Sequence, residues 1–455
     1  MQWNFDEVVE FFSHETRREI LSEGLHGLEK EGLRVQPNGD LAQTPHPAAL
    51  GSAFTDPHIT TDFSESQLEL ITPPLASPKA ALEFLGALHR RVATHLPNDE
   101  MIWPFSAPCR LPEEANIPIA RYGDSPVAQT KEIYRKGLAL RYGKTMQLLS
   151  GVHYNISFSE RFWDLLWEQF GNGLERQAFI NDHYLAIARN FMRHRWMLVY
   201  LFGASPVVDS SYQCKMLAKD KANAISLRLS RCGYSNPAKL HISYHSFDQH
   251  LADLEAAVNT PYSPYTALGV EREGERVQLN DHLLQIINEY YASVRLKATI
   301  EKVDLLPSLK QNGVQYLELR LFDINPFMAY GVDLKQLYFT HLFVLFCLFS
   351  DNPPMTETDL DAATQRQEDV ALRGRELSSE WRKALCDTLN LMRPVAMLMP
   401  PCYAGIVDHY IHACEDPSQL PWARLITEMG SRDFIAYGLE RAHMFHDSLT
   451  NFYDA

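Results

Sequence analysis

Several motifs that would identify a function directly are absent from this sequence. It contains neither a Gly-x-x-x-x-Gly-Lys-[Ser/Thr] phosphate loop nor a dinucleotide-binding glycine fingerprint after a strand pattern, so a nucleotide would have to be held in another way. The cysteines are scattered and form no Cys-x-x-Cys pair, which predicts reduced cytosolic thiols and neither a disulfide framework nor a zinc site. The seven are Cys109, Cys214, Cys232, Cys347, Cys386, Cys402 and Cys414.

Long apolar runs are also missing. The most apolar stretch, residues 337–349, is shorter than a membrane span and contains His341, so we expect a buried helix there. The N-terminus has neither the basic nor the apolar region of a signal peptide, and a cytoplasmic protein is therefore expected.

The chain has an excess of negative charge. Its net charge is −15 and its pI about 5.6. This balance argues against nucleic acid or an anionic membrane as the main partner. Anionic small ligands in a locally positive pocket are not excluded by it.

The chain is long enough for a large core, with 455 residues of which 45% are hydrophobic. It shows no internal repeat, no low-complexity segment and no clear linker. Strand patterns with polar faces occur in both halves. We therefore expect one composite domain over residues 1–455.

The stretch at residues 314–327 organises the rest of the chain. Leu317, Leu319 and Leu321 alternate with Glu318 and Arg320, a period of two that predicts a strand with one apolar and one polar face. Taken alone, this pattern favours a half-exposed strand with a surface charge pair. The same layout returns in other places, which favours a functional site.

Four other segments carry polar side chains in the same manner. In each of them we expect a strand with one face of acidic, basic or imidazole side chains. They are residues 27–35 with Glu29 and Glu31, residues 59–74 with Asp62, Glu65 and Glu69, residues 151–158 with His153 and Asn155, and residues 224–230 with Arg228.

Helices are expected between these strands from the spacing of apolar residues. The predicted helices are residues 6–25, 78–96, 130–149, 176–202, 247–258, 334–350, 358–373 and 376–393. Residues 103–123 read as a long loop, which in a compact domain is often functional. On the 130–149 helix, Tyr134, Leu138 and Tyr142 form one stripe, which by itself is more often core than ligand pocket.

If the predicted strands form one sheet, their polar faces line a cradle with up to six carboxylates, one histidine and two or three arginines. Carboxylates at that density cannot all stay ionised in a partly buried site unless cations bind. Oxygen-dominated ligation favours Mg²⁺ or Mn²⁺ over zinc. Arginines beside such ions suit a polyphosphate.

Six longer motifs carry a resemblance to a known family. They are Gly27-Leu-Glu-Lys-Glu-Gly-Leu-Arg34, residues 59–73 with Thr-Thr-Asp-Phe, Ser150-Gly-Val-His-Tyr-Asn155, Leu201-Phe-Gly-Ala-Ser-Pro206, Ser226-Leu-Arg-Leu-Ser230 with Gly233-Tyr234, and Asp323-Ile-Asn-Pro-Phe327. The sequence resembles the proteobacterial type of glutamate–cysteine ligase (γ-glutamylcysteine synthetase). The motifs keep the family's order over residues 20–335, and the likeness is weaker to residue 395.

The resemblance implies an α+β fold, a glutamine-synthetase-like cradle of mainly antiparallel sheet walled by helices. It implies that ATP, the co-substrate, phosphorylates the γ-carboxylate of L-glutamate. The amine of L-cysteine then displaces phosphate and forms an amide bond, the first step of glutathione synthesis. A monomer without nucleic-acid or membrane partners is expected.

Roles for individual residues also follow from the resemblance. The implied ligands of Mg²⁺ (or Mn²⁺) are Glu29, Glu31, Asp62, Glu69, His153 and Glu318. Arg228, Arg320 and Glu318 are the implied catalytic residues, with Arg320 on the ATP phosphates. The implied substrate-binding residues are Phe63, Tyr134, Arg135, Leu138, Gln147, Asn155, Arg228, Tyr234 and Tyr291, among which Arg135 suits the acceptor's carboxylate. Glu65 has no implied role and reads as a solvated loop charge.

The sequence departs from the family in three segments. The segment at residues 211–225 is shorter than the corresponding loop of the family. Residues 297–313 lack the Arg- and Ser-rich sequence that the family has there. The chain diverges after Arg375, and residues 336–455 are expected to form a divergent helical part. Nucleotide contacts in residues 297–313 therefore cannot be carried over.

Three alternatives remain open from the sequence. The first is a γ-glutamyl ligase for another small amine or amino acid. The second is a divalent-metal hydrolase that uses the same carboxylates without ATP. The third is a ligase-like regulatory subunit that binds ATP without turnover.

Overall fold

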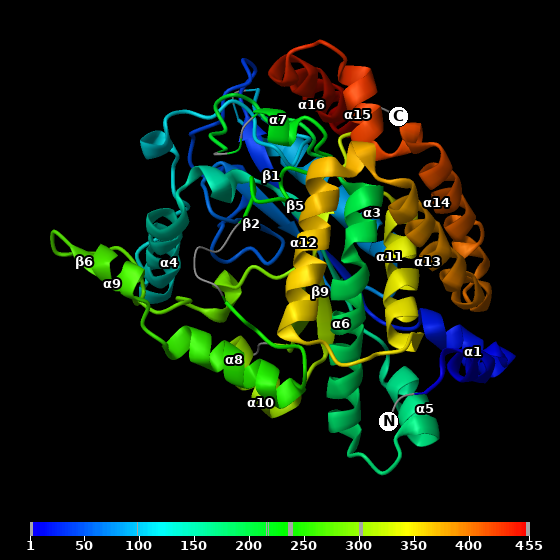
Figure 1. The fold of residues 1–455 in the computed structure, drawn as a ribbon. Helices are drawn as coiled ribbons and strands as arrows, with labels where there is room; N and C mark the ends of the chain where they lie inside the picture. The colour runs from blue at the N-terminus through cyan, green and yellow to red at the C-terminus, as the bar shows by residue number, and fades with distance from the viewer. Residues whose placement is uncertain are drawn as a thin grey trace.

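An antiparallel sheet lies at the centre of the protein (Figure 1). The structure is a computed structural model that describes residues 3–97, 99–214, 216, 218–234, 240–299 and 304–451. The strand order is β2-β3-β1-β5-β9-β8, and β4 pairs with β1 beside this path. The strands are β1 (His26–Val35), β2 (Ile59–Thr61), β3 (Gln67–Ile71), β4 (Met101–Ile102), β5 (Gly151–Ile156), β8 (Val294–Lys297) and β9 (Tyr316–Asp323), with a separate hairpin of β6 (Glu271–Arg272) and β7 (Glu275–Arg276).

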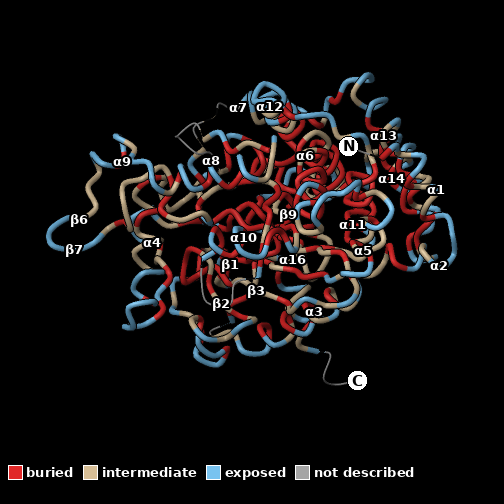
Figure 2. Tube along the Cα trace, turned by 90° about the horizontal axis from the view of Figure 1, so that it is seen from below, coloured by how far each residue is buried: buried red, intermediate tan, exposed pale blue. Residues whose placement is uncertain are grey.

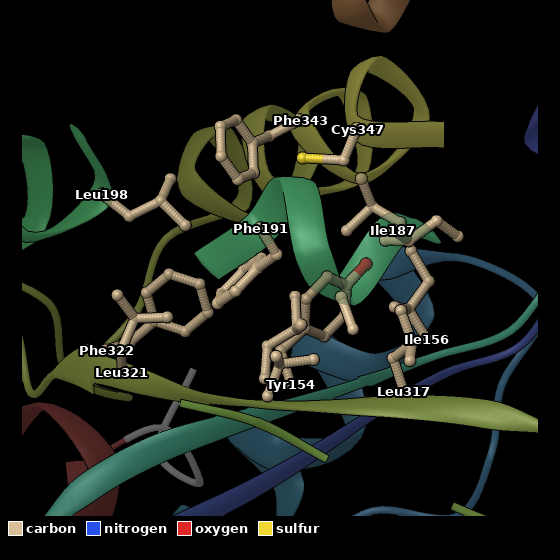
Figure 3. Close-up of a cluster of buried hydrophobic side chains, with 14 of the residues drawn as sticks. Tyr154, Ile156, Ile187, Phe191, Leu198, Leu317, Leu321, Phe322, Phe343 and Cys347 are labelled. Atoms are coloured by element: carbon tan, nitrogen blue, oxygen red, sulfur yellow. The ribbon is translucent and has the colours of Figure 1, made fainter. Parts of the chain in front are cut away.

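Alternation decides which face of the sheet is buried. Leu317, Leu319 and Leu321 of β9 are at most 2% exposed, and they point with Tyr154 and Ile156 of β5 toward the helix α6 (Arg176–Phe202) (Figure 3). The opposite face of the same strands carries the polar side chains, as the period of two predicts. The predicted strands at residues 27–35, 151–158 and 314–327 are confirmed.

Helices cover the apolar face in layers. The helix α6 packs on β9, and α11 and α12 pack on α6 (Figures 1 and 3). The red, buried part of the chain is concentrated around α6, β9 and α11 (Figure 2). The other helices on this side and at the ends of the chain are α1 (Phe5–Ser13), α2 (Glu15–Arg18), α3 (Pro78–His95), α5 (Glu160–Phe170), α11 (Leu334–Phe349), α12 (Glu357–Arg373), α13 (Ser379–Leu398), α14 (Ile406–Glu415), α15 (Pro421–Met429) and α16 (Phe434–Thr450).

A smaller group of elements lies away from these layers, and one of them walls the polar face. In Figure 1 the helices α4, α8, α9 and α10 are drawn apart from the α6 layer. Their bounds are α4 (Pro126–Tyr142), α7 (Ala218–Lys221), α8 (Phe247–Asn259), α9 (Ser263–Leu268) and α10 (Leu305–Asn312). The predicted α+β class with an antiparallel sheet walled by helices is confirmed.

Two predicted helices are shorter than expected. The helix predicted at residues 130–149 begins at Pro126 and ends at Tyr142, because Gly143 takes a positive φ of 83° that stops the helix. Gln147 lies on the 3-10 turn Thr145–Leu148. Residues 6–25 form α1, α2 and a 3-10 turn, with an extended residue, His14, between the two helices.

The prediction of a strand at residues 224–230 is wrong. The segment makes turns, and of its residues Ser226 alone forms a β-bridge, to Ser205. Serine hydroxyls bind the local backbone here: Ser226 Oγ accepts from Leu229 N at 3.3 Å, and Ser230 Oγ donates to the Leu227 carbonyl at 2.8 Å. Such local bonds compete with sheet formation.

The prediction that all cysteines are reduced is also wrong. Cys214 and Cys232 form a disulfide, which their spacing in the sequence did not indicate. The other five cysteines are free. None of the helices formed by the described residues has the length and apolar character of a membrane span.

Candidate active site

A cavity of about 270 Å³ lies on the polar face of the sheet. Strands β1, β3, β5, β8 and β9 supply its floor, and α4 supplies a wall. It is lined by Glu29, Glu31, Asp62, Phe63, Glu69, Tyr134, Arg135, Leu138, Met146, Gln147, Leu149, His153, Arg228, Tyr234, Asn288, Glu289, Tyr291, Arg295, Lys297, Glu318 and Arg320. Every site residue predicted from the sequence is in this set except Asn155.

Strand register brings the charged residues together. Glu29 is paired with His153 between β1 and β5, and Glu31 with Glu69 between β1 and β3. Glu318 is paired with Arg295 on β8. Because paired residues in adjacent strands point to the same face, the five neighbouring strands β3, β1, β5, β9 and β8 produce one continuous charged surface.

His153 lies among three carboxylates. Its Nδ1 is 3.4 Å from Glu29 Oε2 and 3.7 Å from Glu318 Oε1, and its Nε2 is 3.5 Å from Glu31 Oε1. The ring is buried, with 3% of its surface exposed. Glu29, His153 and Glu318 each offer a ligand atom, and these atoms lie within 4.8 Å of one another.

Glu318 is surrounded by positive charge. It accepts a hydrogen bond from Arg320 and lies 3.3 Å from Lys297 Nζ and 3.7 Å from Arg295 Nη1. Burial alone would raise the pKa of this carboxyl, but these three cations hold its pKa well below the ordinary value. Glu318 is therefore ionised at neutral pH.

The carboxylates of Asp62 and Glu69 have too little positive charge nearby to offset the effect of burial on their pKa values. Burial, with the negative charge of Glu31, raises the pKa of Asp62 to about 6. Burial, with the charges of Asp62, Glu29 and Glu31, raises the pKa of Glu69 well above its ordinary value. The acidic side of the cavity thus has an unbalanced negative charge that a cation would relieve.

The donor set fits a hard divalent cation. Five carboxylates and one imidazole meet here, and Glu318 Oε2 accepts no hydrogen bond from the described residues. Oxygen-rich sites of this kind suit Mg²⁺ or Mn²⁺ better than zinc.

Arg228 is held in place by main-chain contacts. Its guanidinium donates to the carbonyls of Phe322 and Arg320, both at 3.2 Å, and lies 3.5 Å from Asp323 Oδ1. A Cβ on Gly151 would come within 2.0 Å of the Arg228 side chain. Glycine at residue 151 therefore leaves the space that the guanidinium occupies.

Aromatic rings form the far end of the cavity. Tyr234 stacks on Tyr291 with ring centroids 4.3 Å apart, and Gln147 Nε2 donates to the Tyr234 hydroxyl at 3.4 Å. Arg135 of α4 also lines the cavity and donates to the carbonyl of Asp62. Of the predicted helix stripe, Tyr134 and Leu138 line the cavity, as the resemblance implies.

The third residue of that stripe, Tyr142, is outside this cavity. Its hydroxyl donates to Glu289 at 2.7 Å, and Arg141 is 2.9 Å from the same carboxylate. This buried network attaches α4 to residues 278–289.

Asn155 lines a second cavity of about 750 Å³, which is also lined by Ile156 and by Tyr184 of α6. Its Nδ2 donates to Glu29 Oε1 at 2.7 Å, so Asn155 orients a carboxylate of the first cavity. Glu29 lines both cavities, and Gly27 and Tyr316 line the second.

Glu65 is not the solvated charge expected from the sequence. It is buried, and its two carboxylate oxygens accept from the main-chain N–H groups of His46 and Arg121, each at 2.6 Å. Glu65 therefore joins two loops outside the cavity.

Sequence reasoning missed six residues of the cavity: Met146, Leu149, Asn288, Glu289, Arg295 and Lys297. For Arg295 and Lys297 a signal was present, because they alternate with Val294 and Leu296 in a period of two. The other four lie in turns without regular spacing.

Comparisons with known proteins agree on one family. The family model for glutamate–cysteine ligase matches residues 9–370. A glutamate–cysteine ligase of Clostridium acetobutylicum is 37% identical, covering 97% of this chain and 100% of that protein. One of Azotobacter vinelandii is 39% identical, with 98% of this chain and 90% of that protein covered.

Solved structures give the same result. A glutamate–cysteine ligase of Francisella tularensis, solved in complex with AMP, superimposes with a TM-score of 0.89 at 30% identity over 94% of this chain and 89% of that chain. A bifunctional glutathione synthetase of Pasteurella multocida has a TM-score of 0.84 at 29% identity, over 100% of this chain and 56% of that chain.

The close contact between Gly151 and Arg228 generates a first prediction. Gly151→Ala should displace the Arg228 guanidinium and lower kcat by about 10²-fold, the size of effect seen when one transition-state donor is lost. The measurement is steady-state kinetics, together with the same substitution in an Arg228→Ala background. If the methyl group acts through Arg228, the two effects will not add. Full additivity would contradict this.

The raised pKa of Glu69 generates a second prediction. Glu69 contributes stability below its unfolded pKa, and this contribution is lost as the pH rises toward the folded pKa, by about 1.4 kcal/mol per pKa unit. In metal-free protein, the free energy of unfolding of Glu69→Gln should therefore rise relative to wild type between pH 5 and 8. Urea unfolding at several pH values measures this difference. Glu255→Gln, on the exposed face of α8, is the matched control, and a pH-independent difference for Glu69→Gln would contradict the raised pKa.

Proposed function

Because this chain belongs to the glutamate–cysteine ligase family, we propose that it joins the γ-carboxylate of L-glutamate to the amine of L-cysteine. ATP is the co-substrate, and ADP and phosphate are released. The observation that carries the proposal is one cavity in which carboxylates, a histidine and four arginines lie between an aromatic pocket and a second cavity.

The strands order the three substrates along the sheet. On β1, Gly27 lines the second cavity, Glu29 lines both, and Glu31 lines the first. On β9, Tyr316 lines the second cavity and Glu318 lines the first. We assign the adenosine part of ATP to the second cavity, with its phosphates directed toward Glu29 and Glu318.

The acidic residues of the first cavity would hold the metal. Glu29, His153 and Glu318 have the tightest arrangement of ligand atoms, and Glu31, Asp62 and Glu69 complete the negative surface. Bound Mg²⁺ or Mn²⁺ would neutralise charge on the ATP phosphates and orient them for transfer.

Arg228 and Arg320 act on the phosphoryl group. An oxygen of the glutamate γ-carboxylate attacks the γ-phosphorus of ATP, the bond to ADP breaks, and a γ-glutamyl phosphate forms. The cysteine amine then attacks the γ-carbonyl carbon, phosphate leaves with the bonding electrons, and the amine nitrogen releases one proton as the amide forms. In both steps the guanidinium groups donate to oxygens that gain negative charge.

The aromatic end of the cavity receives the acceptor. Tyr234, Tyr291, Phe63 and Leu138 offer a small apolar pocket that suits a thiol-bearing side chain. Arg135, at the same end, would bind the acceptor's α-carboxylate. A monomeric state and a cytoplasmic location stay predictions from the sequence.

The direct test is ADP release from Mg²⁺-ATP with L-glutamate and a panel of acceptors: L-cysteine, L-2-aminobutyrate, glycine and ammonia. We expect the fastest turnover with L-cysteine or L-2-aminobutyrate, because the pocket is small and apolar. A faster reaction with another amine would contradict the assignment of L-cysteine as the acceptor, but not the ligase chemistry. ADP release that needs no glutamate would contradict the ligase assignment.

Glu318→Gln should reduce turnover by at least about 10²-fold and leave the protein folded. The substitution keeps the size of the side chain and removes the charge that binds metal, while Leu317 and Leu319 on the other face stay packed. ADP release and the thermal midpoint are the measurements, with Glu255→Gln as the exposed control. Near-normal ADP release by Glu318→Gln would contradict its role at the metal.

A further inference from the structure

Lys297 is a charged residue of the cavity to which the proposed function gives no role. It is the last residue of β8, and its Nζ is 3.3 Å from Glu318 Oε2. Its side chain is 14% exposed, whereas that of Glu318 is 3% exposed. Lys297 is thus an ammonium group at the edge of the cavity that ligands can reach.

The three cations around Glu318 are not equivalent. Arg295 is fixed by bonds from its guanidinium to the carbonyls of Asn288 at 2.7 Å and Tyr290 at 3.1 Å. Arg320 hydrogen-bonds to Glu318 itself. The ammonium group of Lys297 forms no hydrogen bond to the residues that the structure describes, and its contact with Glu318 is an ion pair only. Of the three groups, Lys297 has the most freedom to take another anionic partner.

Three cations surround one carboxylate at this point. Arg320, Lys297 and Arg295 lie within 3.7 Å of Glu318, and Glu29 and Glu31 add negative charge nearby. A metal ion bound to these carboxylates would compete with the cations for their negative charge. Lys297 would then be available to an anionic group of the ligand.

The position of Lys297 identifies that anion. Lys297 is paired with Tyr316 of β9, and Tyr316 lines the second cavity, as does Thr299 two residues further along the chain. Lys297 itself lines the first cavity. It therefore lies at the junction that a polyphosphate would cross between the two cavities.

We propose that Lys297 is a phosphate-binding residue of the ligase, which exchanges its ion pair with Glu318 for non-bridging oxygens of the nucleotide's phosphates. The inference rests on the proposed function and extends it to a residue outside the predicted site. An ammonium on a flexible stem suits this exchange, because it can turn from one anion to the other without moving the strand.

The exchange also gives Lys297 a part in the reaction. While the nucleotide is absent, Lys297 shields the buried Glu318 charge. When the nucleotide is bound, Lys297 offsets negative charge on the phosphates as the bond to ADP breaks. No proton is transferred in this role.

The test compares Lys297→Met and Lys297→Arg with the exposed control Lys310→Met. Lys310 pairs with Glu255 away from both cavities. The first readout is the Kd of ADP measured by calorimetry with Mg²⁺ and without glutamate or an acceptor. We expect Lys297→Met to weaken ADP binding by about tenfold or more, because a charge-assisted bond to phosphate is lost. Lys297→Arg should recover part of this loss.

Kinetics separates this role from a structural one. For Lys297→Met the KM for ATP should rise about as much as the Kd of ADP, while the KM values for glutamate and the acceptor change less than about twofold. The thermal midpoint of the ligand-free variant shows that it is folded. Unchanged ADP affinity in a folded Lys297→Met protein would overturn the proposal, whatever its turnover. If the proposed function itself is wrong, the wild-type protein will not release ADP with glutamate and cysteine. This result separates a failure of the proposed function from a failure of the Lys297 proposal.

Discussion

The pairing of β1 with β5 and of β5 with β9 is the constraint on which the rest of the structure depends. β5 and β9 bury apolar side chains under α6, and all three strands turn charged or imidazole side chains to the other face. The register then decides which charges meet. A slip of one residue would exchange the two faces of a strand and bury its charges in the core. The large core on α6 therefore fixes the geometry of the site as well as the stability of the fold.

The charged side chains of the site are unevenly distributed along the cavity. Three cations hold the pKa of Glu318 low, whereas burial and neighbouring carboxylates raise the pKa values of Asp62 and Glu69. The two regions are joined through Glu29, Glu31 and His153. A divalent cation on the acidic side and a polyphosphate on the basic side would compensate both at once. The cavity is thus suited to a metal–nucleotide complex more than to either component alone.

The central strands and their polar faces could be predicted from the sequence because alternation is a local signal. Glu29, Glu31, His153, Glu318 and Arg320 were all placed correctly on that basis. The segment around Arg228 was not, because serine side chains bind the local backbone and replace the expected strand with turns.

Other parts depend on contacts distant in the sequence. The disulfide between Cys214 and Cys232 and the loop contacts of Glu65 exist only once the chain has folded. Asn155 follows the strand pattern correctly, yet its position between the two cavities depends on the hydrogen bond to Glu29. The short strand β8 has a visible alternation, but four residues are too few for the pattern to stand out.

In the proposed enzyme, one face of the sheet orders nucleotide, metal and acceptor along its strands. A crystal structure with ADP and Mn²⁺, with the metal located by anomalous scattering, would test this order. We expect Mn²⁺ beside Glu29 and Glu318 and the adenine in the cavity lined by Gly27 and Tyr316. Adenine between Arg135 and the stacked pair Tyr234 and Tyr291, or Mn²⁺ away from the carboxylates, would contradict it.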